Sequence, residues 1–299
     1  MTGVQTINMS DPSAVSSLLL RAAESMKTAK GRRGSTQHIP DKGKVLVTGD
    51  LHDNPFHYSK IVKIARLDRG VDHHLVLQEM IHGDKLIGGV DMSFRMLVRI
   101  ATLVVAYPNQ AHPILANHEL SQLTRRGITK GSGNIVEMFI QGVEWVFGTK
   151  SDEVLCAIDQ FILAMPLAVK SSSGLMCCHS LPNAALMHIF DTGILDRAMT
   201  NEDRDNVDGS ATLLVWGRSH TKEQVQELAN LWSVTLFCLG HAHVSDGIEM
   251  LMPGVLLLNS DHEQGAVLPI DLSDIPDAET ALWSAIKLAS LPYEPDHVG

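Results

Sequence analysis

Residues 44–52 read Lys-Val-Leu-Val-Thr-Gly-Asp-Leu-His, an apolar run that leads directly into two potential metal ligands. The run Lys44 to Thr48 predicts a buried strand. Asp50 and His52 follow where that strand ends.

The same arrangement occurs three more times along the chain. The apolar runs are Ala111 to Leu115, Gly174 to Cys178 and Val234 to Leu239, and the polar residues after them are Asn117-His118-Glu119, His179 and Gly240-His241-Ala242-His243. In open α/β sheets, ligand sites form where the carboxyl ends of the strands meet. A parallel or mixed sheet is therefore expected to bring these polar residues together in one pocket at one edge.

This order of motifs, over residues 43–270, resembles the calcineurin-like metallophosphoesterase superfamily, and within it the phosphoprotein phosphatase and diadenosine tetraphosphatase branch. Ala116 takes the place of the glycine that precedes the Asn-His-Glu motif in the superfamily. Trp216-Gly217-Arg218 and residues 244–247 are also similar to that branch. The resemblance implies an α/β fold in which central β-sheets, packed as a β-sandwich, are flanked by helices.

The resemblance also implies a dinuclear centre of divalent transition metals such as manganese, iron or zinc. Asp50, His52 and His243 would bind one ion, and Asn117, His179 and His241 the other. A carboxylate must bridge the two, and the apolar run 74–77 is followed by Gln78-Glu79, so Glu79 is the expected bridge. Two alternatives stay open: Glu79 binds one metal only, or Asp84 takes its place.

The resemblance also gives catalytic roles to Arg218 and His118 and a second role to Asn117. A hydroxide between the metals would attack phosphorus, Arg218 and Asn117 would hold phosphate oxygens, and His118 would protonate the leaving alkoxide.

Residues 78–83, which stand where the superfamily has its second motif, depart from it at two catalytic positions. His82 stands where an aspartate would orient His118, which leaves Asp84 and Glu119 as candidates for that role. Gly83 stands where an arginine would clamp phosphate. Arg125 and Arg126 are either substitutes for it or an ordinary solvated pair.

The leading hypothesis is a metal-dependent phosphomonoesterase, such as a serine/threonine protein phosphatase. A nucleotide or dinucleoside polyphosphate hydrolase is the second hypothesis. The third is a pseudophosphatase that binds metal and docks phosphorylated partners, and it is motivated by the departures in the second motif. The expected partner is a phosphoprotein or a small phosphoester, and the oligomeric state is left open.

Composition agrees with a cytoplasmic enzyme of this kind. The chain has 299 residues, of which 44% are hydrophobic, and a net charge of −10 that argues against a broad nucleic-acid surface. No stretch has the length or the flanks of a membrane span or signal peptide. The four cysteines lie in apolar runs and are expected to be buried free thiols.

We expect three regions: an N-terminal helical extension and linker (1–40), the metallophosphoesterase domain (41–273), and a C-terminal helix and tail (274–299). A helix is expected to begin near residues 10–13 and continue to Met26. Residues 132–165 predict two helices, with Trp145 among the core residues, and Ala278 to Leu291 predicts a last helix.

Overall fold

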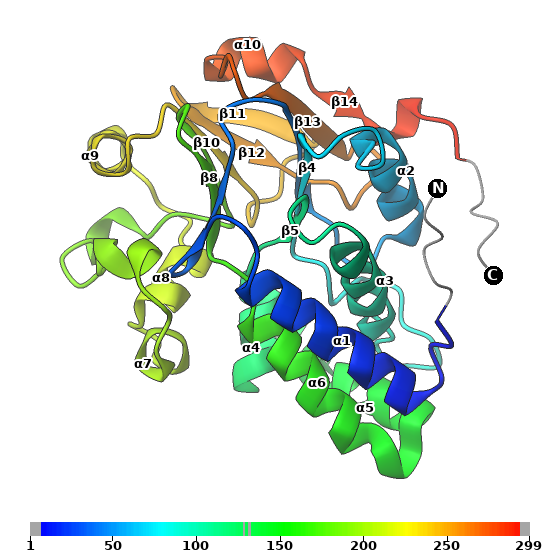
Figure 1. Cartoon of the computed structure of the whole chain (residues 1–299). Coiled ribbons are helices and arrows are strands. Elements are labelled where there is room, and N and C mark those ends of the chain that lie inside the picture. The colour runs from blue at the N-terminus through cyan, green and yellow to red at the C-terminus, as the bar shows by residue number, and fades with distance from the viewer. Residues whose placement is uncertain (1–6, 128, 131–132, 294–299) are drawn as a thin grey trace.

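Two β-sheets packed against each other form the centre of the protein, and helices flank them (Figure 1). The computed structural model describes residues 7–127, 129–130 and 133–293. Buried apolar side chains from both sheets, among them Val47, Val76, Leu236 and Leu256, form one cluster between them. A second cluster joins the sheets to the helices. The expected α/β fold with a central sandwich is confirmed.

The first sheet has five strands and carries the first motifs. Its order is β14 (Ile286–Lys287), β13 (Ala266–Asp271), β3 (Lys44–Asp50), β4 (His73–Gln78) and β5 (Ala111–Pro113). β3, β4 and β5 are parallel and are connected through α2 (Pro55–Ala65) and α3 (Phe94–Ala106). Their carboxyl ends therefore lie at the same edge, which brings Asp50, Glu79 and Asn117 to one end of the sandwich.

The second sheet has seven strands and carries the later motifs. Its order is β1 (Arg32–Arg33), β2 (Thr36–Ile39), β8 (Ala168–Ser171), β9 (Leu175–Cys178), β10 (Leu236–Leu239), β12 (Val255–Leu258) and β11 (Ile248–Met252). β9, β10 and β12 are parallel, and His179, His241 and Asn259 follow their carboxyl ends. The expectation of one sheet edge is thus wrong in detail, because the site is assembled from two sheets.

The two sheets are tied together beside the site. Asp50, the last residue of β3, forms a parallel bridge with Asn259. The Ser260 amide donates to the Asp50 carbonyl (2.8 Å), and the Ser260 hydroxyl accepts from the Gly49 amide (3.0 Å). These bonds fix the spacing between the motif after β3 and those of the second sheet.

The N-terminal segment packs into the same body. α1 (Pro12–Lys27) begins as expected, since the Asp11 carboxylate caps it by accepting from the amides of Ser13 and Ala14. It packs against α6 (Ser151–Leu163) and α3, and β2 pairs with β8 in parallel. The expected boundary near residue 40 falls between β2 and β3, and each of the two apolar clusters contains residues from both sides of it.

The remaining elements surround the sandwich (Figure 1). They are α4 (Asn117–Thr124), β6 (Thr129–Lys130), β7 (Gly133–Asn134), α5 (Ile135–Phe147), η1 (Gly148–Lys150), η2 (Ala184–Leu186), η3 (Thr192–Asp196), α7 (Asn201–Asp205), α8 (Ser210–Trp216), α9 (Lys222–Trp232), α10 (Ala278–Trp283) and η4 (Leu288–Ser290). In the part of the chain that the structure describes, no helix is both long and apolar enough to cross a membrane.

Three expectations need correction. The last helix ends at Trp283 instead of continuing to Leu291, because Ile286 pairs with Val267 and extends the five-stranded sheet. Trp145 is 63% exposed, since it lies on the outer face of α5 and covers Gly88. Cys156 is exposed on α6, although all four cysteines are free thiols as expected.

Candidate active site

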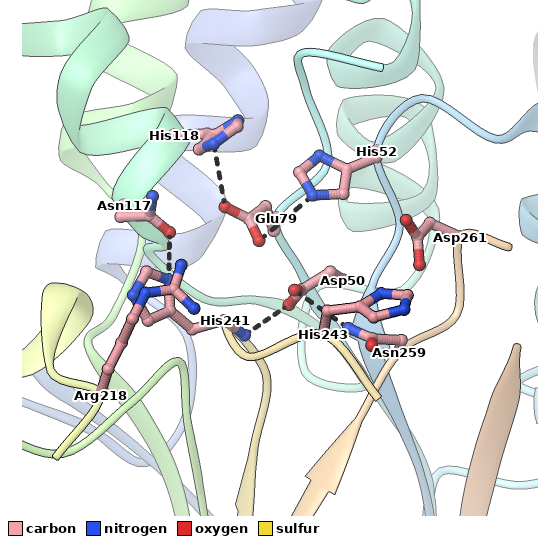
Figure 2. A pocket seen from close by; sticks show the side chains of 10 residues that line it. All are labelled: Asp50, His52, Glu79, Asn117, His118, Arg218, His241, His243, Asn259 and Asp261. Atoms are coloured by element: carbon pink, nitrogen blue, oxygen red, sulfur yellow. Dashed lines mark hydrogen bonds and ion pairs between the residues drawn. The ribbon is translucent and has the colours of Figure 1, made fainter. Parts of the chain in front are cut away.

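A pocket of about 120 Å³ lies at the end of the sandwich where the motifs meet (Figure 2). Its lining residues are Asp50, His52, Glu79, Asn117, His118, Arg218, His241, His243, Asn259 and Asp261. Eight of them are residues that the motifs single out. The remaining predicted ligand, His179, is fully buried and contacts the lining residues Glu79 and Asn117. The sequence thus predicted nearly the whole wall of the pocket.

One group of potential ligand atoms comes from the five-stranded sheet alone. Asp50, His52 and Glu79 each offer an atom within 4.8 Å of the others. Nε2 of His52 lies 3.5 Å from Oε2 of Glu79, and its Nδ1 lies 3.2 Å from the carbonyl of Ile81. That carbonyl accepts the Nδ1 proton, which leaves Nε2 as the nitrogen available to a metal.

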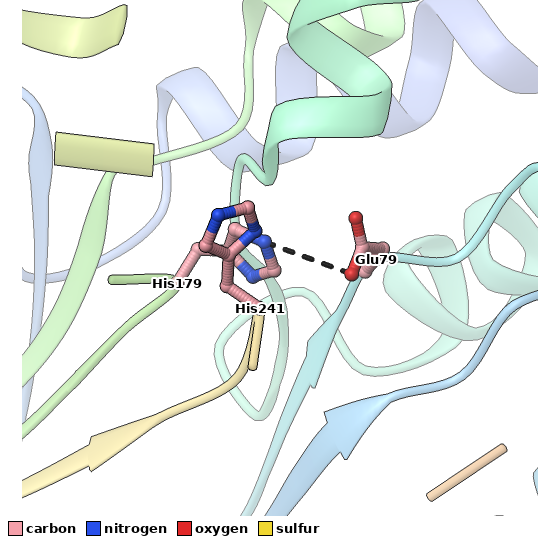
Figure 3. A group of neighbouring side chains, drawn as sticks. All are labelled: Glu79, His179 and His241. Carbon is pink, nitrogen blue, oxygen red and sulfur yellow. Dashed lines mark ion pairs between the residues drawn. The ribbon is translucent and has the colours of Figure 1, made fainter. Parts of the chain in front are cut away.

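A second group combines Glu79 with two histidines of the other sheet (Figure 3). Nε2 of His179 lies 3.7 Å from Oε2 of Glu79, and the ligand atoms of Glu79, His179 and His241 lie within 4.8 Å of one another. The Asn117 amide oxygen lies 2.6 Å from His179 Nε2 and 3.0 Å from His241 Nδ1. Glu79 is therefore common to both groups.

Gln78 is a site residue that the sequence reasoning missed. Its Oε1 accepts from Nδ1 of His179 (3.0 Å), and its Nε2 donates to the carbonyl of Thr48 (2.8 Å). The glutamine thereby fixes the ring orientation of His179 and directs Nε2 toward Glu79 and Asn117. No signal in the sequence separates Gln78 from the apolar strand that it ends.

Asn259 and Asp261 were also missed. The Asn259 amide donates to Oδ2 of Asp50 (3.2 Å), opposite the His241 backbone amide, which donates to Oδ1 (2.9 Å). Their signal was available, since Asn259-Ser260-Asp261 follows the apolar run Val255 to Leu258 just as the predicted ligands follow theirs.

Two other predicted positions differ from the rest. His243 lines the pocket but is exposed and lies outside both groups of clustered ligand atoms, with its ring 5.3 Å from that of His262. Asp84 is exposed and is not among the lining residues. The carboxylate that faces the pocket from this loop is that of Glu79.

The electrostatics of the pocket suit cations. Burial raises the pKa of Asp50 and of Glu79, and the charge of Asp50 raises the pKa of Glu79 further. Burial lowers the pKa of His179 well below its usual value and that of His241 to about 3. Neutral imidazoles, crowded carboxylates and an amide oxygen form a donor set that fits manganese, iron or zinc.

His118 lies at the start of α4, beside the ligand groups. Its Nε2 is 3.7 Å from Oε1 of Glu79, and its side chain is 13% exposed. Glu119 does not orient it through Oε1, because that oxygen accepts from the amides of Met80 (2.7 Å) and Ile81 (3.2 Å). Burial raises the pKa of Glu119 to about 7. The role of Glu119 is to hold the loop that carries Glu79.

Arg218 is the arginine that lines the pocket among the residues described. Arg125 instead pairs with Asp159 (2.8 Å), and Arg126 donates to the carbonyl of Asp205, so neither substitutes for the missing phosphate clamp. A Cβ atom at Gly83 would lie 2.5 Å from the His52 carbonyl oxygen, which explains why no side chain occupies that position.

The fold is that of known phosphatases. The chain is similar to a protein serine/threonine phosphatase from Saccharomyces cerevisiae, with a TM-score of 0.65 and 12% identity over 87% of this chain and 83% of the other. It is also similar to a cold-active protein-tyrosine phosphatase from a psychrophilic Shewanella species, with a TM-score of 0.56 and 12% identity over 88% and 84%.

Comparisons of sequence find no such relatives. No protein-family model matches the chain, and no curated protein matches it. The similarity to these phosphatases is therefore one of fold.

Proposed function

We propose that this protein is a metal-dependent phosphoester hydrolase with a dinuclear centre, acting on phosphomonoesters such as phosphoserine or phosphothreonine. The observation that supports it most is the sharing of Glu79 by two groups of potential ligand atoms, in a pocket that also holds His118 and Arg218. The phosphatase fold agrees with it.

Each residue has a role that its position permits. Asp50, His52 and Glu79 would hold one metal, and Glu79, Asn117, His179 and His241 the other, with His243 available to the first from the pocket rim. The bound metals would polarise the phosphate oxygens and supply a hydroxide near neutral pH.

The chain's own polar groups would act on the substrate. The Arg218 guanidinium and the Asn117 amide would bind phosphate oxygens, and His118 would donate a proton to the departing alkoxide oxygen. With Gly83 in place of an arginine, Arg218 is the cationic side chain that the described part of the chain offers to phosphate in this pocket.

A substrate panel with counted metals tests the proposal. Chelator-treated protein is reconstituted with manganese, iron or zinc, metals are measured by elemental analysis, and turnover is measured on p-nitrophenyl phosphate, bis-p-nitrophenyl phosphate, a phosphopeptide and a dinucleoside polyphosphate. We expect close to two metals per chain and metal-dependent hydrolysis of the monoesters. His179→Ala should lose one metal, whereas His188→Ala, at an exposed histidine that does not line the pocket, should lose none.

Other outcomes have defined meanings. One metal per chain, unchanged by His179→Ala, contradicts the dinuclear centre. A strong preference for the dinucleoside polyphosphate supports the nucleotide hydrolase instead. Binding of phosphopeptide without turnover under any metal supports a phosphate-binding module.

A further inference from the structure

His82 and Asp91 form a buried pair next to His118. Nδ1 of His82 donates to Oδ2 of Asp91 at 2.7 Å, and both side chains are almost fully buried. Oδ1 of Asp91 accepts from the Ser93 amide (2.7 Å), while the Ser93 hydroxyl accepts from the His82 amide (3.0 Å). Backbone and side chain of His82 are thus both fixed.

The His82 ring packs against the His118 ring. Their centroids are 5.4 Å apart with the planes tilted by 55°, and Phe139 packs edge-on against His82 at 5.5 Å. Elsewhere in this protein, His74 and His112 have centroids 5.3 Å apart and make a direct Nδ1···Nε2 hydrogen bond of 3.1 Å. The His74 and His112 rings are stacked at 19°, so what the two pairs share is only a centroid separation that permits contact between ring nitrogens.

The bond to Asp91 determines what His82 offers to its neighbour. When Nδ1 of a neutral imidazole donates its proton, Nε2 is an acceptor. Nε2 of His82 and Nδ1 of His118 are both buried. An acceptor facing Nδ1 of His118 would leave Nε2 of His118, the nitrogen 3.7 Å from Glu79, directed toward the pocket.

We propose that His82 and Asp91 together are the positioning residues of His118, in the place of the acidic partner that the second motif lacks. Asp91 fixes the tautomer of His82, and His82 fixes the ring of His118, so the carboxylate acts through one intervening imidazole. This inference rests on the proposed function, in which His118 protonates the leaving group.

Kinetics on two leaving groups test the pair. Asp91→Asn removes the charge with little change in volume, and we expect it to reduce turnover of an alkyl phosphate by at least about tenfold. Turnover of p-nitrophenyl phosphate, whose leaving group needs no proton, should change less than about threefold. In a His118→Asn background, Asp91→Asn should have no further effect. His82→Asp, which brings a carboxylate next to His118, should restore alkyl phosphate turnover to the Asp91→Asn protein.

A matched control separates positioning from folding. Asp203 is another buried carboxylate, held by Arg197 at 2.6 Å and outside the lining of the pocket. Asp203→Asn should leave the ratio of the two activities unchanged. Equal losses on both substrates in Asp91→Asn, or a loss that persists in the His118→Asn background, would overturn the proposal.

A spectroscopic measurement does not depend on turnover. In metal-free protein labelled with ¹⁵N-histidine, we expect the ring-nitrogen shifts of His118 to change in Asp91→Asn and to stay constant in Asp203→Asn. Unchanged His118 shifts in Asp91→Asn would refute the positioning role. If the wild-type protein hydrolyses no phosphoester, the proposed function fails, and this experiment still decides whether the pair controls His118.

Discussion

At the scale of single residues, Glu79 is the side chain on which both ligand groups depend. Its backbone has a φ of 46°, in the left-handed region, and its carbonyl accepts from the amides of Leu51 (3.0 Å) and His52 (2.9 Å). The backbone of Glu79 is thus held in place, and its carboxylate belongs to both ligand groups.

Two substitutions of Glu79 should therefore separate the effect of its charge on metal binding from the effect of its side-chain length. Glu79→Gln should lower metal content and activity together, because a neutral amide cannot offset two dications. Glu79→Asp keeps the charge, and aspartate tolerates a left-handed backbone, so it should retain far more of both. Elemental analysis and turnover on the same samples give the comparison. Metal content unaffected by Glu79→Gln, but abolished by Asp84→Asn, would contradict the bridging role of Glu79.

Gln78 should control one metal more than the other. Gln78→Met keeps the volume but removes the acceptor for Nδ1 of His179, and loss of such an orienting bond typically weakens metal binding about 10- to 100-fold. Titration calorimetry with manganese should show one weakened site and one unchanged site. Gln37→Met, at a buried glutamine that bonds to the Lys30 carbonyl, is the control. Two equally weakened sites would indicate a general loss of structure.

The predicted ligands that meet at the pocket share a sequence signal with a physical cause. Asp50, Asn117, His179 and His241 follow apolar runs, and the ends of buried strands are visible in a sequence. His82 was interpretable only as a departure from a pattern, because its partner Asp91 is supplied by a loop whose path no local signal reveals.

At the scale of elements, apolar runs located the strands but did not assign them to sheets. β8 and β9 pair as antiparallel neighbours joined by a short turn, and such a pairing is local in the sequence. The pairing of β9 with β10 has no local signal, because it joins segments that are far apart in the sequence. The short α10 also followed from the long-range pairing of β14 with β13.

The histidine pair between β4 and β5 should make stability sensitive to acid. Burial lowers the pKa of His74 to about 4 and that of His112 to about 3. Below about pH 6.5 the unfolded chain binds protons at these two histidines, while the folded pair stays neutral. The free energy of unfolding is therefore greatest above that pH, and it falls as the pH approaches the pKa values of the folded pair. Between pH 7.5 and pH 5, each histidine should lower the free energy of unfolding by about 2 kcal/mol.

Replacement of one histidine checks this. His112→Gln keeps a polar partner for His74, but the glutamine does not titrate. Between the two pH values, the free energy of unfolding of the metal-free variant, measured with urea, should therefore fall by about 2 kcal/mol less than that of wild type. A variant with the same pH dependence as wild type would show that the pair titrates normally.

At the scale of the whole molecule, bound metal should stabilise the packing of the two sheets. The second ligand group takes Glu79 from the five-stranded sheet and His179 and His241 from the seven-stranded sheet. A ligand that binds only the folded state adds about 2.7 kcal/mol to the free energy of unfolding when its free concentration is 100 times its Kd. Manganese should raise the melting temperature of wild type and His188→Ala equally, and that of His241→Ala by a smaller amount. A full shift in His241→Ala would exclude the second group from metal binding.

The division of the ligands between the two sheets also corresponds to the order in which the ligand groups are synthesised. Asp50, His52 and Glu79 all lie within the first 79 residues, whereas His179 is 101 residues beyond Gln78 and His241 later still. A protein is synthesised from its N-terminus, and its early segments begin to fold first. A nascent chain halted within α5 already holds every residue of the first ligand group, and the second cannot close until β10 has left the ribosome. In the proposed dinuclear centre, the first ligand group is therefore synthesised before the second. A chain interrupted before β9 could offer only Asp50, His52 and Glu79 from the two groups of clustered ligand atoms.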